Sequence, residues 1–188
     1  MRIITGKFKG RILNTVKDNG VRPATDHVKG TIFNVLQNRL RVEGARVLDL
    51  FAGSGSLGFE ALSRGADHVV FVDDRKEVLD VIERNAAMLD CVDTCEIMQS
   101  DALAFIRCEH SQYDLIFADP PYAFEDLPAI PELVFSHKLL KKEGFLIIEH
   151  SKHTTFPINN SYRVVVNKEF GNTRVNFFTH RETGEAIA

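Results

Sequence analysis

Short apolar runs typical of buried strands alternate with helical segments along most of this chain, and this alternation is what most limits its fold. Each run precedes a segment in which apolar residues recur at helical spacing. Strands that alternate with helices form a mostly parallel sheet, because each helix carries the chain back through a right-handed crossover. The five expected strands span residues 46–51, 68–72, 95–98, 113–118 and 144–150.

Two further extended runs, 161–169 and 173–180, are joined by Phe170-Gly171-Asn172, which is a hairpin signal. This hairpin is expected to add an antiparallel strand at one edge of the sheet. The sequence therefore predicts an α/β fold. Helices are expected from about residue 26 to 40, from the glycine-rich turn to residue 64, and over 76–89, 102–108 and 127–140.

A glycine-rich motif follows the first expected strand and opens the next helix. It reads Gly53-x-Gly55-x-x-Gly58, and Asp73 lies 20 residues beyond Gly53. This spacing matches the dinucleotide fingerprint, in which the glycines let a ligand approach the backbone and the acid binds ribose hydroxyls. The motif alone leaves open whether the ligand is NAD or another adenosine-bearing cofactor.

Acidic residues around this motif favour S-adenosylmethionine over NAD. Asp49 lies four residues before Gly53, where a negative charge opposes a pyrophosphate but suits an ammonium group. Asp101 ends the third strand, and Asp73 or its neighbour Asp74 ends the second. S-adenosylmethionine carries an ammonium, a sulfonium and no phosphate, so a ring of acids fits it better. Asp49 and Asp101 are also compatible with plain turn positions, where Asp is common.

The motif Asp119-Pro120-Pro121-Tyr122 follows the fourth expected strand directly. Consecutive prolines cannot donate to a strand ladder, so the strand ends there and the chain turns outward. Ligands of open α/β sheets bind outside the carboxyl ends of the strands. There the carboxylate and the prolyl carbonyls can accept from an NH2 group, and the aromatic ring can hold a flat heterocycle. The competing interpretation is a proline turn that merely ends a core strand.

Basic residues gather at the beginning of the chain. The first 46 residues carry ten Lys or Arg against three Asp or Glu, whereas the remainder carries 13 against 23. Lys7, Lys9 and Arg11 alternate in a segment broken by Gly6 and Gly10, so we expect a basic β-hairpin or arm with these side chains on one strand face. Such a face can follow a phosphate backbone. The alternative is a hairpin that only covers the sheet.

The composition argues against several other classes of protein. The three cysteines, Cys91, Cys95 and Cys108, form no paired framework and are expected to be free thiols. The seven histidines show no metal-ligand spacing, so no metal is expected. No apolar run approaches the roughly 20 residues that span a membrane, and no signal-peptide core begins the chain. These features predict a cytoplasmic protein without membrane contact.

Residues 47–58 together with the Asp119–Tyr122 motif resemble the S-adenosylmethionine-dependent amino-methyltransferases. The basic segment 2–11, and the segment 22–26 followed by Phe33-Asn34, resemble one branch of them, the RsmD-type 16S ribosomal RNA (guanine-N2-)-methyltransferases. The resemblance covers nearly the whole chain; the glycine motif is widely shared, and the arm is the specific part. It implies a Rossmann-like class I methyltransferase whose mostly parallel seven-stranded sheet has an antiparallel last strand.

With this resemblance, we expect a basic arm that docks RNA over residues 1–25 and the methyltransferase domain over 26–188. The resemblance implies methyl transfer from S-adenosyl-L-methionine to the N2 amine of a guanine in small-subunit ribosomal RNA. A monomer is expected to act on an assembled or partly assembled 30S subunit. The residues expected to bind the cofactor are Asp49, Phe51, Gly53, Gly55, Gly58, Asp73, Asp101, Ala102 and Thr25. Those expected to bind RNA are Lys7, Lys9, Arg11, Arg22, Pro121 and Tyr122, with Asp119, Pro120 and Tyr122 as the catalytic residues.

Two places depart from the pattern of the family. The second strand usually ends in Glu, whereas Asp73-Asp74 stand here, and we favour Asp73 as the ribose ligand because it directly continues the strand. The helix that follows the arm usually runs Asp-Arg-Val-(Arg/Lys)-Glu-Ala, whereas residues 26–31 read Asp-His-Val-Lys-Gly-Thr. The missing Arg and Glu leave the contribution of this helix to substrate contact open.

Other functions remain compatible with the same residues. Within the methyltransferases, an adenine-N6 enzyme is the alternative, because the Asp-Pro-Pro-Tyr chemistry suits any aromatic amine. Outside that class, the glycine motif also suits an NAD-dependent oxidoreductase, and the basic arm suits a non-catalytic RNA-binding assembly factor. The sequence does not identify the modified nucleotide.

Overall fold

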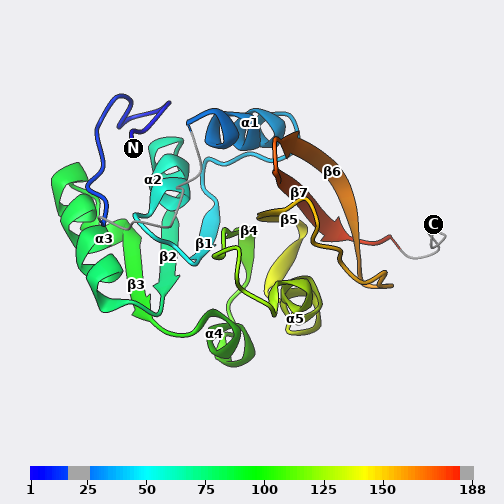
Figure 1. The fold of residues 1–188 in the computed structure, drawn as a ribbon. Helices are drawn as coiled ribbons and strands as arrows, with labels where there is room; N and C mark the ends of the chain where they lie inside the picture. Colours follow the sequence, from blue (N-terminus) through cyan, green and yellow to red (C-terminus); the bar gives the residue numbers. More distant parts are fainter. Residues whose placement is uncertain (17–25, 183–188) are drawn as a thin grey trace.

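Seven strands form one sheet in the part of the chain that the computed structural model describes, residues 1–16 and 26–182 (Figure 1). Their spatial order is β3-β2-β1-β4-β5-β7-β6. The order reverses between β1 and β4, which is the switch point where open α/β sheets bind ligands. In chain order the strands are β1 (Arg46–Leu50), β2 (His68–Asp73), β3 (Cys95–Gln99), β4 (Tyr113–Ala118), β5 (Leu140–Ser151), β6 (Tyr162–Phe170) and β7 (Thr173–His180).

The first five strands run parallel to one another, and β7 runs antiparallel to both β5 and β6. The predicted mostly parallel sheet with an antiparallel last strand is therefore confirmed. The hairpin lies at one edge of the sheet as expected. Within it, β6 is the outermost strand, and the antiparallel strand β7 lies between β6 and β5.

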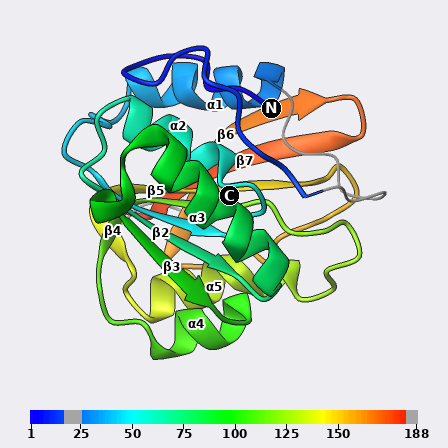
Figure 2. The same ribbon diagram turned by 90° about the vertical axis from the view of Figure 1, so that its left-hand side faces the viewer.

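Helices cover both faces of the sheet (Figures 1 and 2). One face packs against the first three helices and the opposite face against the last two. The α-helices are α1 (Asp26–Gln37), α2 (Ser56–Ser63), α3 (Lys76–Leu89), α4 (Ala102–Cys108) and α5 (Ile130–Ser136), with short 3-10 helices η1 (Val92–Thr94) and η2 (Leu127–Ala129).

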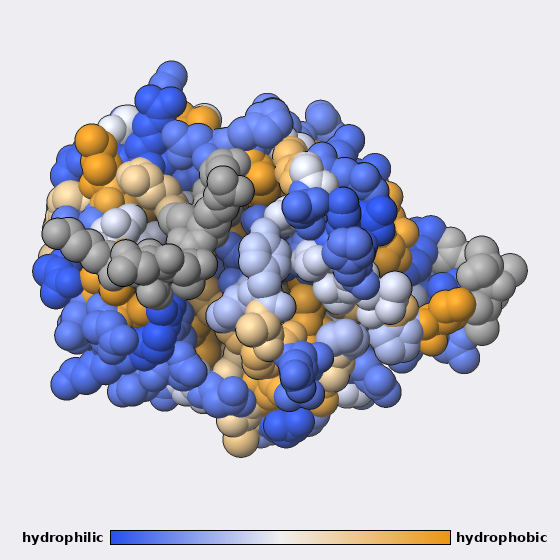
Figure 3. Space-filling model, viewed as in Figure 1, coloured by the Kyte–Doolittle hydropathy of each residue, from blue (hydrophilic) through white to orange (hydrophobic). Residues whose placement is uncertain are grey.

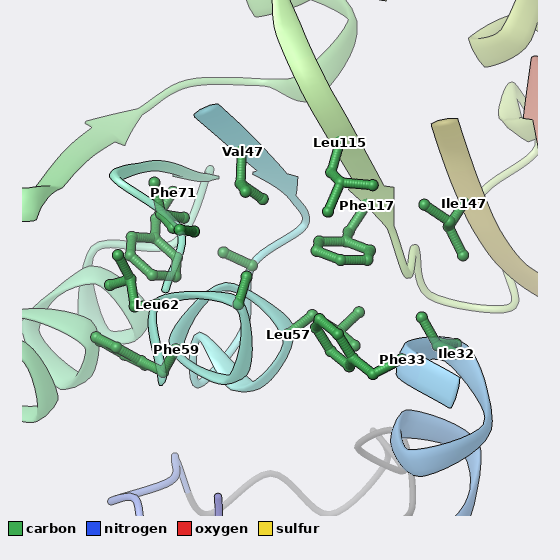
Figure 4. Close-up of a cluster of buried hydrophobic side chains, with 14 of the residues drawn as sticks. Ile32, Phe33, Val47, Leu57, Phe59, Leu62, Phe71, Leu115, Phe117 and Ile147 are labelled. Atoms are coloured by element: carbon green, nitrogen blue, oxygen red, sulfur yellow. The ribbon is translucent and has the colours of Figure 1, made fainter. Parts of the chain in front are cut away.

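Successive strand residues contribute to two separate apolar clusters, one on each face. Val47 and Leu115 face α1, α2 and α3, whereas the next residues, Leu48 and Ile116, face α4 and α5. Figure 4 shows the first cluster, in which Phe33 of α1 lies near Phe117 of β4, with ring centroids 5.7 Å apart. A strand buried on both faces reads as a continuous apolar run, which is why the sequence identifies these strands.

The predicted helix 127–140 and strand 144–150 have different bounds in the structure. Helix α5 ends at Ser136, Lys138 adopts a left-handed φ of 58°, and β5 already begins at Leu140. Gly144 therefore lies inside β5. A Cβ there would lie 2.8 Å from the carbonyl oxygen of Asp114, beside a register shift between β4 and β5. The glycine permits this close approach instead of marking the start of the strand.

The predicted alternation of Lys7, Lys9 and Arg11 along one strand face is wrong. Residues 5–10 form turns, and the antiparallel pairing is the single bridge between Arg2 and Ile12. The amide of Lys9 donates to the Gly6 carbonyl and that of Arg11 to the Phe8 carbonyl, so the segment coils on itself. The three basic side chains are exposed, but they are presented by turns.

The arm, residues 1–14, is attached to the helices that cover the sheet. Ile3 and Leu13 are buried in the first cluster, and the Lys7 amide donates to the carbonyl oxygen of Ser63 at 2.8 Å. Gly6 has a φ of 88°, and a Cβ on it would overlap the Ser63 carbonyl, so only glycine fits there. The arm is thus held by α2. Its separation as residues 1–25 from a domain over 26–188 stays a prediction.

The described surface shows no extended hydrophobic patch in the view of Figure 3. Hydrophobic side chains lie there in small groups among hydrophilic ones. None of the described helices combines the length and apolar character that crossing a membrane requires. Cys91, Cys95 and Cys108 are free thiols, as predicted.

Candidate active site

A pocket of about 200 Å³ opens at the carboxyl ends of β1, β2 and β4, and we call it the glycine-loop pocket. The parallel strands end together there, so side chains far apart in the sequence meet in one place. The predicted site residues that line it are Asp49, Phe51, Gly53, Asp73, Asp101, Ala102, Asp119 and Pro121. Residues that the sequence reasoning did not single out also line it, among them Met1, Ser54, Ser56, Arg75 and Phe124.

Of the three motif glycines, only Gly53 lines this pocket. Gly55 has a φ of 76°, and a Cβ there would lie 2.6 Å from the Phe59 ring. A Cβ on Gly58 would overlap the ring of Phe71 in β2. Gly55 and Gly58 therefore allow the sharp turn and the close packing of α2 on the sheet. Neither is among the residues that line the pocket, and their expected contact with the cofactor stays a prediction.

Asp49 is buried in β1, with only 2% of its surface exposed. Its Oδ2 accepts a hydrogen bond from the Gly58 amide at 2.9 Å. Burial, opposed by that bond and reinforced by the charge of Asp73, raises the pKa of Asp49 to about 8. A carboxyl group in this state gains strongly from a nearby cation, so Asp49 is suited to an ammonium group.

The raised pKa of Asp49 gives a prediction about stability. The folded protein keeps this proton up to about pH 8, whereas the unfolded chain releases it near 3.8, so stability falls as pH rises between these values. Asp49→Asn keeps an acceptor for the Gly58 amide and removes the titration. Between pH 6 and 7.5 we expect the native protein, freed of small molecules, to lose about 2 kcal/mol relative to the variant. Urea unfolding at both pH values measures this loss. An equal change in the free energy of unfolding for the two proteins would contradict the prediction.

Asp73 and Asp74 differ clearly in their surroundings. Asp73 is 6% exposed, and its carboxylate accepts from the Gly53 amide at 3.1 Å and from the Arg75 amide at 3.1 Å. The Nε of Arg75 also donates to it at 3.3 Å. Asp74 is exposed, although it too lines the pocket. The ordered carboxylate against the glycine loop is that of Asp73, which supports it as the ribose ligand.

Asp101 has a structural contact as well as a place in the pocket. Its Oδ1 accepts from the Ala104 amide at 2.8 Å and caps the start of α4. The next residue, Ala102, is buried and lines the pocket beside it. The alternative of a plain turn residue is thus partly correct, because capping explains an Asp here whether or not a ligand binds.

Asp119 lies where the glycine-loop pocket meets the proline motif. Its side chain is half-buried, and burial together with the charges of Glu149 and Asp49 raises its pKa well above the ordinary range. In the adjoining loop, Phe124 packs edge-on against Phe51 with ring centroids 4.9 Å apart. Phe51 adopts a left-handed φ of 57°, which is unusual for an aromatic residue and is often found at functional sites.

A second pocket, which we call the Tyr122 pocket, lies on the other side of the proline motif. It measures about 330 Å³ and is lined by Pro120, Pro121 and Tyr122, by His150 at the end of β5 and by the segment that follows this strand. Pro121 and Phe124 belong to both pockets, so the motif is a partition between them. The Tyr122 hydroxyl lies 2.6 Å from Oγ1 of Thr173, and 67% of the residue is exposed. The ring is therefore anchored at its hydroxyl end while it remains largely accessible.

Glu149 is a residue that the sequence reasoning missed. It is half-buried near the end of β5, and its Oε2 has no hydrogen-bond partner among the described residues. Burial raises its pKa to about 7. One signal in the sequence could have identified it: Glu149 is an acid in the apolar run of the fifth strand. Burying an acid costs free energy, so an acid at such a place is a candidate functional residue.

Two predicted residues, Arg22 and Thr25, lie outside the described residues. Lys7, Lys9 and Arg11 are described but lie in the arm and line neither pocket. Within the described ranges no group of three or more His, Cys, Asp or Glu side chains is arranged to hold a metal ion.

Comparison with known proteins identifies the family. A family model described as "Conserved hypothetical protein 95" matches residues 1–179. The chain belongs to this family. Its relatives include ribosomal RNA small subunit methyltransferase D of Haemophilus influenzae, 36% identical over 155 residues, which are 81% of this chain and 79% of that protein. The Bacillus subtilis protein YlbH is 36% identical over 185 residues, 96% of this chain and 100% of that protein.

Two solved structures share the whole fold. The Escherichia coli protein yhhF matches with a TM-score of 0.84 and 29% identity, covering 96% of this chain and 97% of that one. The Haemophilus influenzae protein HI0767 matches with a TM-score of 0.80 and 31% identity, covering 96% and 98%. The RsmD-type methyltransferase family and the Rossmann-like methyltransferase fold, both predicted from the sequence, are confirmed. The role of each site residue stays a prediction.

Proposed function

We propose that this protein transfers a methyl group from S-adenosylmethionine to the N2 amine of a guanine in small-subunit ribosomal RNA. The observation that carries the proposal is the set of acids in the glycine-loop pocket. Asp49, Asp73, Asp74, Asp101 and Asp119 line it, and the basic side chain among its described lining residues, Arg75, already donates to Asp73. Such a pocket disfavours a pyrophosphate, whereas an ammonium or a sulfonium stabilises the ionised form of its acids. Relatives named small subunit methyltransferase D support the ribosomal substrate.

The described residues fit S-adenosylmethionine at several points. Gly53 lets the ligand approach the backbone, and Asp73, fixed by that glycine's amide, suits the ribose hydroxyls. The buried Asp49 suits the ammonium, whose charge compensates its desolvated carboxylate. Asp101 and Ala102 suit the adenine ring. Thr25 and Arg22 stay candidates for the methionine end of the cofactor.

The residues around the proline motif would orient the target amine. When bound, the cofactor supplies an electrophilic methyl group on sulfur. The guanine amine is a poor nucleophile because its lone pair is delocalised into the ring. Asp119 and the Pro120 carbonyl would accept its N–H groups, and Tyr122 would stack on the flipped base. Orientation of this kind can supply about 7–11 kcal/mol of the rate enhancement.

The alternatives differ in what the pocket must bind. An NAD-dependent oxidoreductase needs groups that bind a pyrophosphate, which the acids of the glycine-loop pocket oppose. An adenine-N6 methyltransferase stays the second candidate, because the same acceptors suit an adenine amine. A non-catalytic assembly factor would not need the acids or the proline motif. Action on an assembled or partly assembled 30S subunit, as a monomer in the cytoplasm, is part of the proposal.

A methyl-transfer assay on undermodified small ribosomal subunits tests the proposal. Isotope-labelled S-adenosylmethionine should deliver label to the small-subunit RNA, and mass spectrometry of the digested RNA should identify N2-methylguanine. Label in N6-methyladenine would favour the second candidate. Absence of transfer, with tight binding of the subunit, would favour the assembly factor.

The Asp73→Ala substitution should weaken S-adenosylmethionine binding by about 1–3 kcal/mol, the scale of hydrogen bonds to a charged acceptor. The Asp73 carboxylate accepts from the Gly53 amide and lines the pocket, whereas Asp74 is exposed. The matched control, Asp74→Ala, should change binding by less than about 0.5 kcal/mol, as exposed substitutions usually do. Isothermal titration of both variants measures the difference. The reverse ranking would assign the ribose to Asp74.

We expect Lys7 and Lys9 to contact the RNA backbone, since both are exposed on the arm. Each phosphate contact contributes about 0.7–0.9 to the slope of log affinity against log salt. Replacing both lysines by Ala should therefore flatten that slope by about 1.4–1.8 units. Arg11 is tested separately, because its guanidinium donates to the Met88 carbonyl at 2.7 Å and its loss also affects packing.

The control for the arm is the pair Lys142→Ala and Lys168→Ala, two exposed lysines on β5 and β6. Subunit binding of each variant is measured across a salt series beside its melting temperature. An arm that only covers the sheet predicts a lowered melting temperature with an unchanged slope. That result would remove the support for RNA docking by Lys7 and Lys9.

A further inference from the structure

Asp119 and Glu149 follow paired positions on neighbouring parallel strands. Ala118 of β4 pairs with Ile148 of β5, so the next residues of the two strands continue the same register. Adjacent strands lie about 4.8 Å apart, and residues in register point to the same face of the sheet. Phe117 and Ile147, two residues earlier, both face α1, α2 and α3. The two carboxyl groups therefore belong side by side on that face.

This pair contains a polar atom that lacks a partner. Glu149 Oε2 is buried and accepts no hydrogen bond from the described residues. A buried carboxylate oxygen without a donor is costly, and a second negative charge beside it is costlier still. The charged groups that act on Asp119 are the carboxyls of Glu149 and Asp49. Asp49 is already bound to the Gly58 amide, so Glu149 is the acid whose oxygen remains to be satisfied.

We propose that Asp119 and Glu149 hold one proton between them, with the Asp119 hydroxyl donating to Glu149 Oε2. Glu149 is then a positioning residue: it fixes which oxygen of Asp119 carries the proton and leaves the carbonyl oxygen for the substrate. Two neighbouring carboxyl groups in a poorly solvated site do not both ionise, which agrees with the raised pKa values of both acids.

The shared proton changes the role of Asp119 in methyl transfer. This part of the inference rests on the proposed function. A protonated Asp119 is a hydrogen-bond acceptor and not a general base. It accepts one N–H of the guanine amine and so orients the nitrogen lone pair. As the new nitrogen–carbon bond forms, the methyl carbon–sulfur bond breaks and its electrons stay on sulfur. The proton that the nitrogen loses passes to water.

Asp119→Asn distinguishes an acceptor from a base. Its amide oxygen can accept from the substrate, and its N–H can donate to Glu149, so both contacts of the proton-sharing pair survive. We expect its single-turnover rate to stay within about tenfold of the native rate, whereas Asp119→Ala falls by about 100- to 1000-fold. If Asp119→Asn falls as far as Asp119→Ala, Asp119 acts as a carboxylate and the shared proton is overturned.

Infrared spectroscopy tests the shared proton without any substrate. Its result therefore does not depend on the outcome of the methyl-transfer assay. Asp49→Asn is the background, because Asp49 is the other acid of the site with a raised pKa. At pH 7 this protein should show the carbonyl band of a protonated carboxyl, and adding Asp119→Asn should abolish it. Adding Glu149→Gln should move the loss of the band to lower pH, because burial still raises the pKa of Asp119 but the charge of Glu149 is gone.

A purely structural Glu149 predicts a different result. Glu149→Gln would then lower the melting temperature and leave both the band and the titration of Asp119 in place. A missing band in the Asp49→Asn background at pH 7 would equally overturn the proposal. Both substitutions are close in size to the native residues, so folding is expected to survive, and a melting curve for each variant verifies it.

Discussion

Asp119→Ala is expected to lower the rate of methyl transfer by about 100- to 1000-fold, the cost of removing one preorganised hydrogen-bonding group from a transition state. Asp119 follows β4 directly and lines the glycine-loop pocket at the partition between the two pockets. An alanine there cannot accept from the guanine amine, so the amine is held less well. Single-turnover rates with saturating undermodified subunits measure the loss.

Binding and stability separate this effect from a general disturbance of the site. Cofactor affinity should change little, because Asp49 and Asp73 remain in place. Removal of a poorly solvated acid should not lower the melting temperature. The matched control is Asp126→Ala, an exposed acid in the same loop, which should leave all three quantities unchanged. Near-normal turnover of Asp119→Ala would remove Asp119 from the reaction.

The fold could be predicted because its strands are buried on both faces. Runs such as Tyr113–Ala118 are apolar at nearly every position, and helical spacing between them left few arrangements. The bounds of β5 were predicted wrongly because a glycine can either end a strand or make room for a neighbouring chain. The sequence predicts Gly144 as the start of a strand, but in the structure it accommodates the close approach of the Asp114 carbonyl inside β5. A sequence pattern does not distinguish a glycine that breaks a strand from one that makes room for a neighbour.

Only part of the candidate site could be predicted from the sequence, because some of its residues depend on contacts between distant parts of the chain. Residues at the ends of strands, such as Asp49, Asp73 and Asp119, could be placed together because parallel strands end at one edge. Glu149 lies at the same edge, but no motif accompanies it, and its importance comes from the register between β4 and β5. Spacing also did not show that Gly55 and Gly58 serve packing, since that depends on the rings of Phe59 and Phe71.

The conformation of the arm could not be predicted from its local sequence. Lys7, Lys9 and Arg11 alternate in the sequence, yet the segment forms turns, because its amides find acceptors on α2. Those acceptors are more than 50 residues away in the chain. One of them is Glu60, an acid inside an apolar helix, and it pairs with the buried Lys29 of α1. Both buried charges contact the arm, because Glu60 accepts from the amides of Ile4 and Thr5 and Lys29 donates to the carbonyl of Arg2.

Glu60→Ala is expected to destabilise the protein by about 3–5 kcal/mol, the usual cost of breaking a buried ion pair from one side. Both side chains are fully buried, and their charged atoms lie 3.8 Å apart. The Glu60 carboxylate also accepts from the amides of Ile4 and Thr5 at 2.7 and 3.1 Å. The variant leaves Lys29 buried without its counter-charge and leaves two arm amides without their acceptor. Urea unfolding at neutral pH measures the loss.

Removing the other partner should cost less, and this asymmetry tests the explanation. In Lys29→Met, the Glu60 carboxylate keeps its two amide donors and the Arg64 guanidinium at 2.9 Å.

Burial lowers the pKa of Lys29 and Glu60 opposes that effect, so Glu60→Ala should lower the pKa of Lys29 further. The unfolded chain then binds more protons, and the deficit of Glu60→Ala should shrink as pH rises toward 10. Glu83→Ala, at an exposed site on α3, is the control. A larger loss for Lys29→Met, or a deficit that does not depend on pH, would show that the uncompensated charge of Lys29 does not account for the cost of Glu60→Ala.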